Sequence, residues 1–136
     1  SYFSGVTNGD GDNKVEFASG NETVLAWKEM ESSGLGAYGG MSGSGANAIF
    51  RSTSTPNTPK TPLNSVGIGL DYTTQTLESG SASYNAFILG NEDGSGLNDG
   101  AGFSADQAST LDKKVDDGMP TSGRVYGFNG SSCVDA

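Results

Sequence analysis

Glycine most limits what this chain can fold into, because it accounts for 22 of the 136 residues. It adds no side chain to a core and loses much conformational freedom when ordered. Only 33% of the residues are hydrophobic, yet six Phe, five Tyr and one Trp are too many for a solvated coil. We therefore expect one folded domain, residues 1–136, with a small core, long Gly/Ser-rich loops and no membrane span.

The charge balance and the missing residue types exclude several functions. The formal net charge is −9, whereas binding to nucleic acid phosphates requires a basic face. Histidine is absent, which removes Ser-His-Asp and Cys-His catalysis in their usual forms. Cys133 is the single cysteine, so the sequence contains no internal disulfide. The chain is thus expected to be neither an enzyme nor a nucleic-acid-binding protein.

Residues 21–34 have the pattern of an amphipathic helix. Asn21 is favoured at a helix N-terminus, and Gly34 is suited to the left-handed turn that ends a helix. The expected apolar face consists of Val24, Leu25, Trp27 and Met30. A lone Trp on a helix is more often a core residue than a ligand platform, so we expect Trp27 to be buried.

A second helix is predicted over residues 104–117. Ser104 and Gln107 form a capping box, in which each residue hydrogen-bonds to the backbone of the other. Gly118 follows the helix, and Pro120 prevents its continuation. Asp116 and Asp117 are expected to face solvent or to cap local turns.

Four segments are candidate strands, because apolar residues alternate in them or form short runs. They are residues 48–51, 66–72, 84–89 and 124–128. The candidate strands do not alternate with helices, so the sequence does not indicate a parallel sheet. The predicted fold is therefore α+β, with a small antiparallel sheet of three or four strands, short helices and long loops.

An acidic turn near the N-terminus is a candidate calcium loop. Asn8, Asp10, Asp12 and Glu16 place four oxygen-bearing side chains within a short stretch, and the intervening glycines would let the loop wrap around a hard cation. The candidate metal ligands are Asp10, Asp12 and Glu16, with Ca²⁺ as the possible ion. A hydrated turn explains the same residues, and residues 91–99 form a second, weaker candidate loop.

Two sequence blocks carry a family resemblance. The first spans residues 9–35 and combines a Gly/Asp-rich turn, an Ala26-Trp27 pair and a Gly34-Leu35 end. The second spans residues 104–127. Its shared residues are Asp112-Lys113-Lys114, Asp116-Asp117-Gly118, Pro120, Gly123 and Val125. Together the blocks resemble the globular C-terminal domain of bacterial type IV pilin-like proteins, including the pseudopilins of secretion systems.

This resemblance implies a non-catalytic structural subunit of a type IV pilus or a type II secretion-like pseudopilus. Its implied partners are other copies of the subunit and the inner-membrane assembly machinery, and its implied location is an extracellular pilus or the bacterial periplasm. Such subunits assemble through an N-terminal hydrophobic helix, which is expected to have been removed here and to be the only membrane contact. Cys133 is then either unbridged or paired with a cysteine of that missing part.

The resemblance also implies that one apolar sheet face packs on the missing helix. The expected residues of this face are Val66, Ile68, Leu70, Phe87, Leu89 and Val125. In the truncated chain, the helix that carries Trp27 is expected to cover the face in part, and a large exposed apolar patch would favour truncation.

The alternative function is a secreted, acidic, β-rich binding module that recognises a glycan or a surface. Tyr38, Tyr72 or the Thr/Pro-rich loop of residues 52–62 would then make the contacts. A concave cluster of aromatic residues would favour this alternative.

Overall fold

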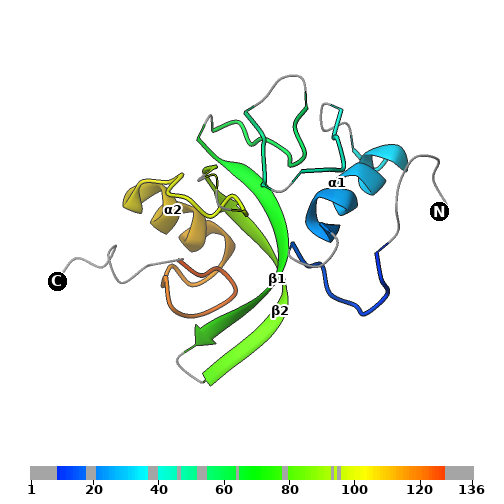
Figure 1. Cartoon of the computed structure of the whole chain (residues 1–136). Coiled ribbons are helices and arrows are strands. Elements are labelled where there is room, and N and C mark those ends of the chain that lie inside the picture. The colour runs from blue at the N-terminus through cyan, green and yellow to red at the C-terminus, as the bar shows by residue number, and fades with distance from the viewer. Residues whose placement is uncertain are drawn as a thin grey trace. The chain divides into compact units, whose positions relative to one another are not determined.

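The computed structural model describes residues 9–17, 21–36, 40–45, 47–51, 55–63, 65–77, 80–92, 94 and 96–127. These residues form two helices and a two-stranded antiparallel sheet, which confirms the α+β class (Figure 1). The elements are α1 (Glu22–Ser32), β1 (Gly67–Leu77), β2 (Gly80–Gly90) and α2 (Ala105–Val115). Among the described residues, no helix is both long and apolar enough to cross a membrane.

The chain divides into two compact units. Unit 1 comprises Ser1–Thr73 and Tyr84–Gly102, and unit 2 comprises Thr74–Ser83 and Phe103–Ala136. Each unit is described by itself below, and the expectation of a single domain stays a prediction.

The ends of α1 are set by backbone conformations at both flanks. Asn21 has φ 59°, and its carbonyl accepts the Val24 and Leu25 N–H groups at 3.1 Å, while its side chain makes no capping bond. At the other end Gly34 has φ 77°, and the Leu35 N–H donates to the Met30 carbonyl at 3.0 Å. This is a Schellman motif. The predicted helix is therefore confirmed, with its flanking residues acting as caps.

Local capping also defines α2, in unit 2. The Gln107 N–H donates to Ser104 Oγ at 3.3 Å, and the Ser104 N–H donates to Gln107 Oε1 at 2.9 Å, which confirms the capping box. The helix ends at Val115, two residues before the predicted boundary. Its buried residue is Asp112, whose Oδ1 accepts the Gly118 N–H at 3.3 Å.

β1 and β2 form a hairpin whose faces follow from the register. Thr74 and Ser83 share a hydroxyl–hydroxyl hydrogen bond of 2.6 Å across the strands. Because side chains alternate along a strand, residues at even spacings from this pair share its face. In unit 1 that face carries Ile68, Leu70, Tyr72, Phe87 and Leu89. Val125, also expected on this face, belongs to neither strand. Phe87 remains 69% exposed and Leu89 40% exposed.

The core of unit 1 is small, as the composition indicates. Its buried hydrophobic residues are Val24, Trp27, Met41, Ala48, Phe50 and Val66. Trp27 is only 4% exposed, which confirms its expected place in the core. Its ring also contacts Phe87, with ring centroids 6.3 Å apart, so α1 covers part of the apolar hairpin face.

The expected strand at residues 48–51 is wrong. The Ala48 N–H donates to the Gly96 carbonyl at 2.6 Å, and side chains accept the other three backbone N–H groups. Asn57 Oδ1 accepts the Ile49 N–H at 2.6 Å, and Glu92 Oε1 accepts the next two N–H groups at 2.6 and 2.7 Å. With these donors satisfied, the segment has no need of a sheet partner.

The expected strand at residues 124–128 is not formed by its described residues, 124–127, and Phe128 lies outside the described part. The Asp116 carboxylate accepts the N–H groups of both Arg124 and Val125, and the Gly127 N–H donates to the Pro120 carbonyl at 2.9 Å. The predicted sheet of three or four strands is therefore corrected to two strands for the described residues.

Glu31 makes the stability of the segment after α1 depend on pH. Its carboxylate accepts the Gly40 and Met41 N–H groups at 2.8 Å each, and the Gly40 bond is the main cause that lowers the Glu31 pKa below its ordinary value of 4.5. A lowered folded-state pKa stabilises the fold above the unfolded pKa, and this stabilisation disappears as pH falls through the folded pKa.

We therefore expect the amides of Gly40 and Met41 to lose protection from hydrogen exchange as the pH drops below about 4.5. Glu31→Gln should flatten this pH dependence, whereas Glu29→Gln on the same helix should leave it unchanged. The same acid-induced loss in Glu31→Gln would show that another group controls the segment.

Candidate functional site

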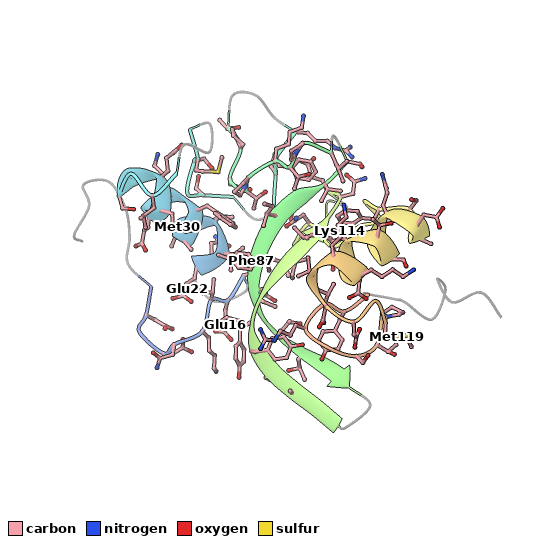
Figure 2. All side chains as sticks on the ribbon, turned by 180° about the vertical axis from the view of Figure 1, so that it is seen from behind. Glu16, Glu22, Met30, Phe87, Lys114 and Met119 are labelled. Atoms are coloured by element: carbon pink, nitrogen blue, oxygen red, sulfur yellow. The ribbon has the colours of Figure 1, made fainter. Side chains whose placement is uncertain are left out.

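The Glu22 carboxylate organises the acidic loop that precedes α1. Its Oε1 accepts the Asp10 N–H at 2.8 Å, and its Oε2 accepts the Glu16 N–H at 3.3 Å. The Glu22 N–H in turn donates to the Glu16 carbonyl at 3.1 Å. Figure 2 labels Glu22 and Glu16 close together beside α1. Glu22 is 9% exposed, so the first turn of α1 presents a buried anchor for this loop.

Local turns bring Asp10 and Asp12 to the same place. Asp10 Oδ1 accepts the Asp12 N–H at 3.1 Å, and Asp12 Oδ1 accepts the Lys14 N–H at 2.8 Å. Lys14 Nζ lies 3.7 Å from Asp12 Oδ2. Carboxylate oxygens of Asp10, Asp12 and Glu22 lie within 4.8 Å of one another. These three carboxylates are the group that could hold a cation.

The structure thus brings together two of the three predicted metal ligands, with Glu22 in the place expected for Glu16. Glu16 supplies backbone groups to this arrangement, and Asn8 lies outside the described residues. The sequence signal for Glu22 was its position in the first turn of a helix, which indicated only a favourable interaction with the helix dipole. Calcium binding by Asp10, Asp12 and Glu16 stays a prediction.

Thermal unfolding tests this prediction. Bound calcium should raise the melting temperature by at least about 1 °C at millimolar concentration, because a ligand that binds only the folded state stabilises it. Asp12→Asn should lose the rise, while Asp106→Asn, which removes a charge in the other unit, should keep it. If calcium leaves the melting temperature of the unsubstituted protein unchanged, the three carboxylates do not bind calcium and only organise the loop.

A second acidic group lies in unit 2, where carboxylate oxygens of Asp112, Asp116 and Asp117 lie within 4.8 Å of one another. Asp117 accepts the Met119 N–H at 2.8 Å and the Ser122 hydroxyl at 2.7 Å. The backbone N–H of Arg124 is the main cause that lowers the Asp116 pKa. These carboxylates cap the turns after α2, which confirms the expectation for Asp116 and Asp117.

The weaker candidate loop, residues 91–99, has a structural role in its described part. Asn91 and Gly100 form a bridge, with the Asn91 N–H donating to the Gly100 carbonyl at 2.7 Å. The Glu92 carboxylate accepts the backbone N–H groups of residues 50 and 51. Among the described residues, no metal-ligand group forms in this loop.

An open hollow of about 360 Å³ lies in unit 1, beside this loop. Three segments distant in sequence form its walls: the loop before α1, the middle of β1 and the loop after β2. The lining residues are Glu16, Phe17, Asp71, Tyr72, Gly96, Leu97 and Asp99. The hollow thus contains Tyr72, one of the expected contact residues of a binding module, whereas Tyr38 lies outside the described residues.

Comparison with known proteins identifies no relative. The chain matches no protein-family model, and no significant similarity to a curated protein or to a solved structure was found. The family resemblance therefore depends on the two sequence blocks alone.

Proposed function

We propose that the chain is the exposed, pilin-like head of a non-catalytic structural subunit of a type IV pilus or a type II secretion-like pseudopilus. The observation that carries the proposal is the apolar hairpin face, on which Phe87 is 69% exposed and Leu89 40% exposed. Isolated exposed apolar residues are common, but neighbouring ones on one sheet face mark an interaction surface. The resemblance assigns this surface to the hydrophobic helix through which subunits assemble.

The roles of the shared family residues support a structural protein. Gly34 and Leu35 close α1 in a Schellman motif, and Trp27 packs in the core. Gly123 has φ 77°, and a Cβ there would lie only 2.0 Å from the Asp116 carboxylate. These residues position backbone and fill the core, which is what a filament head requires of them.

The proposal includes partners and a location. The subunit binds further copies of itself and the inner-membrane assembly machinery, and it resides in an extracellular pilus or in the periplasm of a bacterium. Whether it serves adhesion or secretion depends on which filament it joins.

The coding sequence upstream of Ser1 is the first test of this proposal. A short basic leader followed by about 20 apolar residues that open a helix supports it. An ordinary cleavable signal peptide that ends near Ser1 would remove the assembly mechanism and favour a secreted binding module, the second candidate. The hollow with Phe17 and Tyr72 in its walls is the observation that favours this second candidate.

We further expect Leu89→Ser, made in the full-length gene, to lower the amount of protein in sheared filaments by about tenfold, because it removes an apolar contact worth about 1.5 kcal/mol or more. Leu63→Ser is the matched control, since Leu63 is also 40% exposed in unit 1 but lies outside the hairpin face. Immunoblots of the filament fraction, normalised to total subunit, measure the effect. Equal assembly of both variants would exclude the face from filament contacts.

A further inference from the structure

The residues that line the hollow in unit 1 favour a positively charged ligand. Glu16, Asp71 and Asp99 line it together with Phe17 and Tyr72, and no lining residue is Lys or Arg. Because Asp71 and Tyr72 are neighbours in β1, their side chains point to opposite faces of the strand, so Phe17 is the aromatic residue beside the Asp71 carboxylate. The Phe17 ring lies next to Gly96, where a Cβ would be 3.6 Å from it. Aromatic faces and carboxylates attract cations, and an anion would be repelled from this lining.

Asp71 contributes a half-buried carboxylate to the lining. Its Oδ1 accepts the Phe17 N–H at 3.1 Å, and no described Lys or Arg forms a salt bridge with it. Burial is the main cause that raises the Asp71 pKa above its ordinary value. A half-buried carboxylate with backbone donors alone is stabilised in its charged form when a cation enters.

The Tyr72 ring already has a cation beside it, outside the hollow. Lys14 Nζ lies 5.1 Å from the centroid of the Tyr72 ring, within the range of a cation–π contact. Lys14 does not line the hollow. The aromatic side chain available to a ligand in the hollow is therefore that of Phe17.

We propose that this hollow binds one organic cation, an alkylammonium or guanidinium group. Its volume of about 360 Å³ is in the range of small-molecule sites and far exceeds that of a bare metal ion. Its carboxylates are not among the groups that converge to metal-ligand distances in the described residues. The cation is either a free amine or the side chain of a Lys or Arg residue of a basic protein segment, and the site does not depend on the filament role.

Amide chemical shifts of the ¹⁵N-labelled protein test this site at constant ionic strength. The probes are n-butylammonium, ethylguanidinium and an acetylated, amidated Gly-Lys-Gly peptide, with glucose and calcium as neutral and metal comparisons. We expect saturable shifts at Phe17, Tyr72 and Gly96 with the organic cations. A free amine that binds as tightly as the peptide identifies a small-molecule site, and tighter peptide binding identifies a protein side chain.

Isosteric variants separate binding from folding. Asp71→Asn keeps an acceptor for the Phe17 N–H and should weaken cation binding by about tenfold or more. Phe17→Leu should weaken it as well, while Tyr72→Leu, whose side chain points to the other face of β1, and Asp12→Asn, which removes a charge elsewhere, should bind as the unsubstituted protein does. Unchanged circular dichroism verifies each fold. Equal shifts with glucose, or unchanged affinity in Asp71→Asn, would overturn the proposal.

Discussion

Replacing Gly90 with alanine should destabilise the protein by about 3 kcal/mol, because the added methyl group meets backbone atoms that cannot move aside. A Cβ at Gly90 would lie 2.5 Å from the Asn98 carbonyl oxygen and 2.7 Å from that of Gly100. Movement of Gly100 would break its backbone bonds with Asn91, and movement of Asn98 would break its side-chain bond to the Ile88 carbonyl at 3.3 Å. Urea unfolding followed by circular dichroism measures the loss.

Gly11→Ala is the control for the general effect of adding a methyl group. Nothing lies within 4 Å of a Cβ at Gly11, but its φ of 85° is unfavourable for alanine. We expect a cost of about 1 kcal/mol from backbone strain alone. A Gly90→Ala variant no less stable than Gly11→Ala would show that the loop after β2 moves to admit a side chain.

Features that depend on neighbours in the sequence could be predicted. The capping box of α2 joins Ser104 and Gln107, three residues apart, and the Schellman motif of α1 depends on Gly34. The alternation that indicated strands at residues 66–72 and 84–89 is also local, and both lie in or overlap β1 and β2. In each case the groups that interact belong to one turn or one strand. The residues that determine the structure therefore appear together in the sequence pattern.

The two segments that were wrongly predicted as strands bond to side chains that lie outside the segments themselves. Residues 48–51 form a short, mostly apolar run, as residues 84–89 do, but Glu92, more than 40 residues away, accepts the N–H groups of residues 50 and 51. Asp116 does the same for Arg124 and Val125. Side-chain acceptors for backbone donors leave no periodic signal, so the sequence could not distinguish these segments from strands.

The candidate sites were predictable in part for the same reason. Asp10 and Asp12 are close in sequence and meet through tight turns, whereas Glu22 joins them only because α1 places its first turn against the loop. Glu16 and the loop at residues 91–99 are predicted calcium ligands, whereas Tyr72 is an expected contact of a binding module. Their meeting in one hollow depends on the packing of three separate segments.

Trp27→Ala should cost about 3–5 kcal/mol, since it removes the largest side chain of a small core. Trp27 is 4% exposed and packs among few other large residues, so little can move in to fill the space. The total stability of a domain of this kind is about 5–15 kcal/mol, and the variant should therefore be close to unfolding at 37 °C. Leu35→Ala, at a residue that is 77% exposed, should change stability by less than about 0.5 kcal/mol.

The same variant tests whether the chain is one domain. Trp27 belongs to unit 1, whereas α2 belongs to unit 2. If the units unfold together, as the expectation of a single domain requires, Trp27→Ala should reduce hydrogen-exchange protection in α2 by the same free energy as in the hairpin residues 67–73. Retained protection in α2 would show that unit 2 is stable alone. The resemblance that joins residues 9–35 to residues 104–127 would then link two domains rather than describe one head.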